Sequence, residues 1–184
     1  MLQFDGNGHL FPYEVHDATL EEMREIFVDA FPESETRKRL FDNYLDWIFD
    51  FQHDIFPYFP QWIDGSFVTQ KLNPEDIDFV TFLDWQVYEI KEKWKELERF
   101  WSFSNEEKGL DTYLIKEFPP EHPDFSKIEV QKQTWRKLYY TFTRASKSEM
   151  WVQKQTWRKL YGYTRNTPLK PKLPKRFVQI KFEK

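Results

Sequence analysis

The chain has 184 residues, of which 40% are hydrophobic and 20% aromatic, and it has no cysteine. This length is typical of one domain with a small C-terminal appendage, and the aromatic content is ample for a packed core. The lack of cysteine excludes disulfides, thiolate metal sites and cysteine nucleophiles. No basic leader with an apolar run and no 18-residue apolar segment occurs, so we expect a soluble cytoplasmic protein with no membrane partner.

The net charge of −4 hides a strong asymmetry along the chain. Residues 1–129 contain 12 Lys and Arg against 29 Asp and Glu, whereas residues 130–184 contain 15 against 2. Either the basic part folds back on the acidic body, or it offers a surface to polyphosphate or nucleic acid, and the two are compatible. We therefore expect a core over residues 1–129 and a basic helical extension over residues 130–184.

The first third of the chain predicts two helices and a short strand. The capping-box motif TLEE at residues 19–22 predicts a helix over residues 20–30. Apolar residues at helical spacing predict a longer helix over residues 35–54. Residues 59–64 (FPQWID) then predict a short strand that runs into Gly65-Ser66.

The middle of the chain predicts a strand, a helix and a second strand after a short helix over about residues 67–71. The most strand-like segment is IDFVTFL, residues 77–83. Residues 85–103 predict a helix with Glu and Lys pairs on its solvent face, and LDTYLI at residues 110–115 predicts another strand. Together these elements predict an α+β fold with a small mixed β-sheet packed with helices.

The C-terminal part contains an internal duplication. The sequence VQKQTWRKLY occurs at residues 130–139 and again at residues 152–161. On one continuous helix, the 22-residue offset would place both copies on nearly the same side. The interpretation we favour is a duplication that lengthens a helix, and the other is a doubled Trp, Arg and Lys face for nucleic acid. Helical segments are expected to about Tyr161, and alternation predicts a terminal strand over residues 176–182.

Two aspartates one residue apart open the strongest predicted strand. In a strand, Asp76 and Asp78 would lie on one face about 6.5–7 Å apart, while Ile77 and Phe79 cover the other face. Two like charges side by side suit a divalent cation better than a bare surface. Asp111 stands near the start of the next predicted strand. If the two strands are neighbours, three carboxylates converge, an arrangement that holds one or two Mg²⁺ for phosphoryl or nucleotidyl transfer.

Gly65 and Ser66 supply features of a phosphate site. A glycine after a strand lets the backbone approach a phosphate closely, and Ser66 adds a hydroxyl. The first amides of the short helix expected over residues 67–71 would add donors and a positive dipole end. Lys71 is a candidate charge partner for a triphosphate, and the competing interpretation is a solvated surface lysine.

The order of these motifs resembles the polymerase-β-type nucleotidyltransferase superfamily, and most closely its small, minimal bacterial members. The resemblance rests on residues 61–115 and implies that Gly65 and Ser66 bind the nucleotide triphosphate, while Asp76, Asp78 and Asp111 hold the metals. Many minimal members follow Gly-Ser with an Arg and a further Gly, whereas Phe-Val-Thr follows here. Both ends of the chain also look like an uncharacterised bacterial branch.

The resemblance implies Mg²⁺-dependent transfer of a nucleoside monophosphate from an NTP, with ATP the first candidate. The acceptor would be a hydroxyl of a protein, an RNA or a small molecule, and Asp111 would be the ligand or base nearest to it. The alternative is a non-catalytic protein of the same fold whose basic C-terminal part binds RNA or a protein partner. An antitoxin-like role would follow by analogy alone.

Overall fold

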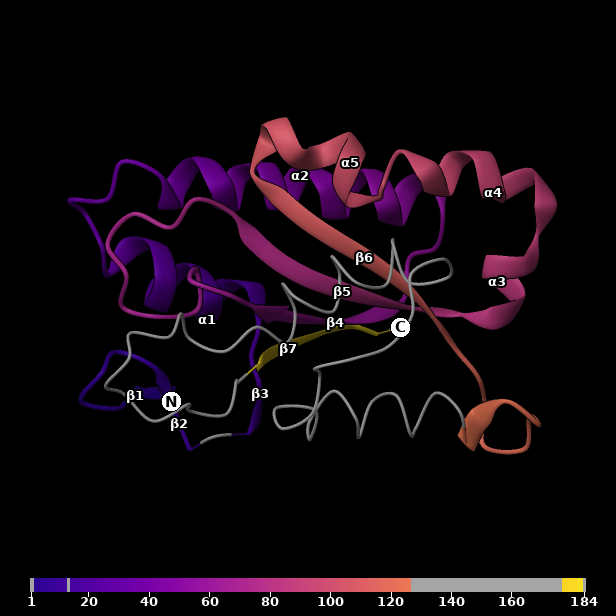
Figure 1. Ribbon diagram of the computed structural model, residues 1–184, viewed down its shortest axis with the longest axis horizontal. Coiled ribbons are helices and arrows are strands. Elements are labelled where there is room, and N and C mark those ends of the chain that lie inside the picture. Colours follow the sequence, from indigo (N-terminus) through magenta and orange to yellow (C-terminus); the bar gives the residue numbers. More distant parts are fainter. Residues whose placement is uncertain (1, 13, 127–176, 184) are drawn as a thin grey trace, which may run out of the picture. The chain divides into compact units, whose positions relative to one another are not determined.

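The computed structural model describes residues 2–12, 14–126 and 177–183 (Figure 1). The chain divides into two compact units, Met1–Glu117 with Arg176–Lys184, and Phe118–Lys175. The duplicated segments, and the helical segments expected to about Tyr161, lie outside the described residues.

The first unit is an α+β structure. Its elements follow one another in this order: β1 (Gln3–Phe4), β2 (Leu10–Phe11), β3 (Val15–Asp17), α1 (Leu20–Arg24), the π-helix η1 (Glu25–Asp29), α2 (Arg37–Asp54), β4 (Phe59–Asp64), β5 (Ile77–Asp84), α3 (Trp85–Glu89), α4 (Lys91–Glu98), α5 (Ser102–Asn105), the 3₁₀ helix η2 (Glu106–Lys108), β6 (Leu110–Glu117) and β7 (Phe177–Phe182).

The strands form a two-stranded hairpin, β1–β2, and a five-stranded mixed sheet in the order β3-β7-β4-β5-β6. β4 is antiparallel to both of its neighbours, β5 and β7, whereas the β5–β6 and β3–β7 pairs are parallel. Figure 1 shows β7 beside β4 in this sheet. The terminal strand therefore belongs to the first unit, and not to the extension expected over residues 130–184.

One face of the sheet packs against α2, because the strands turn their apolar residues towards it. The ring of Phe79 on β5 meets Tyr44 edge-on at 5.1 Å and Trp47 at 4.9 Å between centroids. The hydroxyl of Tyr44 donates to Gln61 Oε1 (2.7 Å), and Gln61 Nε2 donates to Thr81 Oγ1 (2.7 Å). These polar groups are fully buried, so the bonds avoid the cost of unsatisfied donors and acceptors.

Several aromatic residues on the opposite face of the sheet are also buried. Alternation along the strands places the side chains of Trp62, Phe82 and Phe177 on this second face. The Trp62 ring lies 4.9 Å from Phe82 and 5.3 Å from Phe177 between centroids. Asp78 follows the same alternation and so lies on the second face, away from α2.

The elements expected over residues 20–30, 35–54, 59–64, 77–83, 110–115 and 176–182 are confirmed within a few residues, as is the mixed sheet. The continuous helix expected over residues 85–103 is wrong. Ile90 takes an extended backbone (φ −67°, ψ 109°) and separates α3 from α4. α3 is instead tied to β6, since Lys116 Nζ lies 2.7 Å from Glu89 Oε1 and 5.2 Å above the Tyr88 ring.

Candidate functional site

Three aspartates lie side by side on the second face of the sheet. Asp64 at the end of β4 pairs with Asp78 on β5, and Asp78 pairs with Asp111 on β6. Directly paired residues point to the same face, and neighbouring strands are about 4.8 Å apart, so the three backbone positions span about 10 Å. We call this set the aspartate row. All three residues are buried, with 4%, 8% and 4% of their surface exposed.

Core packing fixes the backbone beneath the row. The neighbours of Asp78 along β5 are Ile77 and Phe79, and both are fully buried among the apolar residues of the α2 side. Leu110 and Thr112 flank Asp111 in the same way. Because a shift of one residue in either strand would turn these neighbours away from the core at α2, the register that aligns the carboxylates is strongly specified.

The row contains one acid that the sequence analysis did not nominate and lacks one that it did. Asp64 is the missed residue. Its signal is its place at the end of a predicted strand, directly before Gly65-Ser66, which becomes informative only once the β4–β5 register is known. Asp76 lies one residue before β5 and is half-buried, outside the register that aligns Asp78 with Asp111.

Gly65 lies directly against the Asp78 carboxylate. Its φ of +77° is in the left-handed region, which only glycine adopts without cost. A Cβ at this position would overlap Asp78 Oδ2. The glycine is therefore required both by its backbone conformation and by the approach of the carboxylate.

The short helix expected over residues 67–71 is absent, and a buried arginine explains why. Arg37, from the first turn of α2, is fully buried and donates to the carbonyls of Phe67 (2.8 Å), Thr69 (2.7 Å) and Lys71 (2.5 Å). Carbonyls that converge on one guanidinium are not aligned along a common axis, as the carbonyls of a helix are. The helix dipole that we had expected to face a phosphate is consequently absent.

Ser66 and Lys71 stand in this same loop. Ser66 is half-buried, and its carbonyl accepts from Thr69 Oγ1 at 2.7 Å. Lys71 is exposed, and its ammonium lies 3.5 Å from Glu75 Oε1. The roles of both residues in binding a triphosphate stay predictions.

The Mg²⁺ site that the sequence indicates stays a prediction. In the parts of the chain that the structure describes, no group of three or more His, Asp or Glu side chains could hold a metal ion. Magnesium, however, is commonly bound through one or two carboxylates together with substrate phosphates and water. Asp78 and Asp111, paired on neighbouring strands, offer the two carboxylates that such a site needs.

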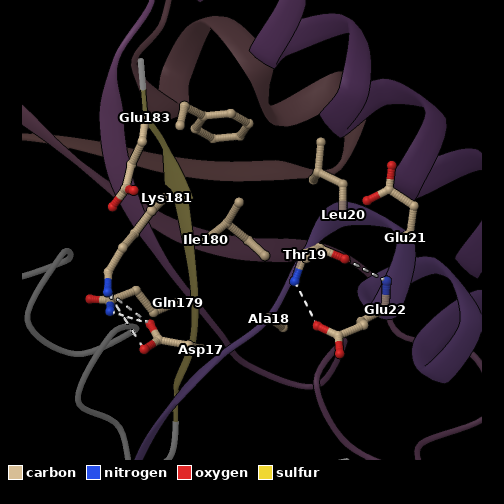
Figure 2. A pocket seen from close by; sticks show the side chains of 11 residues that line it. Asp17, Ala18, Thr19, Leu20, Glu21, Glu22, Gln179, Ile180, Lys181 and Glu183 are labelled. Atoms are coloured by element: carbon tan, nitrogen blue, oxygen red, sulfur yellow. Dashed lines mark hydrogen bonds and ion pairs between the residues drawn. The ribbon is translucent and has the colours of Figure 1, made fainter.

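A cavity of about 560 Å³ lies elsewhere, at the junction of β3, β7 and α1 (Figure 2). Its polar groups already bind one another. Thr19 and Glu22 form a capping box, and Asp17 accepts from Gln179 Nε2 at 2.6 Å. This bond and the nearby Lys181 lower the pKa of Asp17 below its ordinary value. No residue of the aspartate row lines the cavity.

Comparison with known proteins identifies a family but no characterised relative. The model of a family of unknown function, DUF6932, matches residues 2–181. No curated protein and no solved structure matches the chain. In the described part of the chain, no helix has both the length and the apolar character needed to span a membrane.

Proposed function

We propose, for a chain that belongs to this family of unknown function, a nucleotidyltransferase-like fold and Mg²⁺-dependent transfer of a nucleoside monophosphate from an NTP to an acceptor hydroxyl. The observation that carries the proposal is the buried aspartate row beside Gly65-Ser66. Carboxylate oxygens on neighbouring strands are ligands of the kind that Mg²⁺ prefers. Rigid strands also hold the carboxylates where a metal–nucleotide complex requires fixed ligands.

Each residue of the site would have its own role in such a transfer. The acceptor oxygen would attack the α-phosphorus, the bond from that phosphorus to the bridging oxygen would break, and pyrophosphate would leave. Asp78 and Asp111 would hold the metal, Asp111 would also take the acceptor proton, and Asp76 would add a carboxylate at the approach to β5. Bound Mg²⁺ would supply charge neutralisation at the phosphates and activation of the acceptor hydroxyl. Gly65, Ser66 and Lys71 would face the triphosphate.

Calorimetric titration of ATP and of GTP, each with Mg²⁺, tests the proposal. Wild type should bind a nucleotide only when Mg²⁺ is present, and Asp78→Asn should remove that binding, because an amide cannot replace an anionic ligand. Asp84→Asn is the matched control. It lies at the far end of β5, is exposed, and its side chain accepts from Gln86 N as a helix cap, a role that asparagine retains.

A second candidate function rests on the charge asymmetry of the sequence. The 15 basic residues of 130–184 against two acids would suit RNA or an acidic protein partner without any catalysis. Binding of this kind should weaken steeply with salt and should not change in Asp78→Asn. If the wild-type protein does not bind a Mg²⁺-nucleotide but binds RNA with this steep salt dependence, the second candidate is favoured over the first.

A further inference from the structure

Arg37 is fully buried, and its guanidinium is surrounded by hydrogen-bond acceptors of the backbone. Its guanidinium makes five hydrogen bonds to four backbone carbonyls: to those of Phe67, Thr69 and Lys71 in the loop after β4, with Lys71 bonded twice, and to that of Phe27 in η1. The Arg37 Cζ also lies 4.0 Å from the centre of the Phe31 ring.

Backbone dipoles and an aromatic face, not carboxylates, surround this charge. Burial lowers the pKa of Arg37 to about 10, which leaves it charged at neutral pH. A guanidinium offers five N–H donors in a rigid plane, whereas a lysine ammonium offers three from a flexible stem. Lysine therefore cannot reproduce this set of bonds.

The arginine gives a definite shape to the loop that follows Gly65-Ser66. By binding the alternate carbonyls at residues 67, 69 and 71, it holds the loop in a non-helical turn. The N-terminal hairpin also contacts this loop, because Gln70 N donates to the carbonyl of Gly8 at 2.8 Å and His9 forms an antiparallel β-bridge with Thr69. The start of this loop is Gly65, which packs against Asp78. Arg37 therefore holds the segment that directly follows Ser66.

We propose that Arg37 is a positioning residue for nucleotide binding: it holds the Gly65–Lys71 loop so that Gly65 and Ser66 face the phosphates of an NTP bound at Asp78. This inference rests on the proposed function, and it adds a residue that no motif of the sequence nominated. Arg37 does not touch the nucleotide in this scheme. It acts through the loop backbone.

Arg37→Lys tests the inference, with Tyr44→Phe as the control for lost stability alone. Tyr44→Phe removes a buried hydrogen bond on the same helix, to Gln61, without touching an Arg37 bond. Both variants are titrated with Mg²⁺-ATP at a temperature where circular dichroism shows them folded. We expect at least about tenfold weaker binding in Arg37→Lys, as for a small misplacement of binding groups, and wild-type affinity in Tyr44→Phe.

A second readout does not depend on nucleotide. Hydrogen exchange at the amide of Gln70 should accelerate in Arg37→Lys but not in Tyr44→Phe, because only the former releases the loop. If Arg37→Lys does not fold, Phe31→Leu replaces it, since that change removes the ring under the guanidinium and leaves the arginine in place.

The outcomes separate the two proposals. If the wild-type protein binds Mg²⁺-ATP and Arg37→Lys binds it equally well, the positioning role is overturned and the proposed function still stands. Equal losses in Arg37→Lys and Tyr44→Phe also overturn it, because they show a general effect of stability. Wild type that binds neither Mg²⁺-ATP nor Mg²⁺-GTP overturns both proposals.

Discussion

At the scale of single residues, the site depends on a close fit between backbone and carboxylate. Gly65 adopts φ +77° and lies where any Cβ would overlap the Asp78 carboxylate. The sequence predicted that Gly65 and Asp78 belong to one site, because the motif order pointed to both. It could not predict Asp64, since a single acid at a strand end has no signal until the pairing of β4 with β5 is known.

Gly65→Ala should therefore destabilise the protein and abolish Mg²⁺-ATP binding. The left-handed backbone costs about 1–2 kcal/mol for an L-residue, and the overlap with Asp78 adds to this. Urea unfolding measures the loss. Gly6→Ala is the matched control, because a Cβ there meets nothing within 4 Å, and its stability should stay near that of wild type. Equal stability of the two variants would contradict the close packing at Gly65.

A second residue-scale prediction concerns Tyr44. Burial raises the pKa of its phenol above the ordinary value of 10.0. Above pH 10 the unfolded chain releases this proton and the folded protein keeps it, so the free energy of unfolding should fall as pH rises, by up to about 1.4 kcal/mol per pH unit. Tyr44→Phe should be less stable at pH 8 and show a shallower alkaline decline in urea unfolding between pH 8 and 11. Parallel curves for the two proteins would disprove the assignment.

At the scale of elements, helical spacing predicted α2, alternation predicted β7, and runs of strand-forming residues predicted β4, β5 and β6. The elements that the sequence missed are held by contacts distant in the chain. Arg37 of α2 holds the loop after Gly65 by hydrogen bonds. Glu89, the last residue of α3, pairs with Lys116 of β6. No local pattern encodes such partners, so the expected helices over residues 67–71 and 85–103 were wrong.

The position of β7 inside the sheet gives a prediction about stability at the scale of elements. β7 lies between β3 and β4, and its Val178 and Ile180 are buried in the core. Deleting residues 177–184 should remove cooperative thermal unfolding, because β3 loses its parallel partner and β4 loses one neighbour. Deleting residues 183–184 alone leaves β7 complete and should preserve the transition. A cooperative transition in the longer deletion would show that β7 is dispensable.

At the scale of the whole molecule, the chain joins an acidic body to a strongly basic later part. The terminal strand β7 follows the basic segment in the chain and lies inside the sheet, between β3 and β4. Both ends of residues 118–175 are therefore connected to the first unit. Composition predicted the charge division but not this return. A strand's pairing partner depends on the whole sheet, and the sequence identified β7 only as a strand.

The most direct test of the central claim is a crystal structure with Mn²⁺ and a non-hydrolysable ATP analogue. Mn²⁺ takes the oxygen ligands that suit Mg²⁺ and can be located by its anomalous scattering. We predict an anomalous peak within ligand distance of Asp78 and Asp111, with the phosphates of the analogue beside Gly65-Ser66. Nucleotide bound away from the aspartate row, or a fully occupied analogue with no metal at Asp78, would contradict the account.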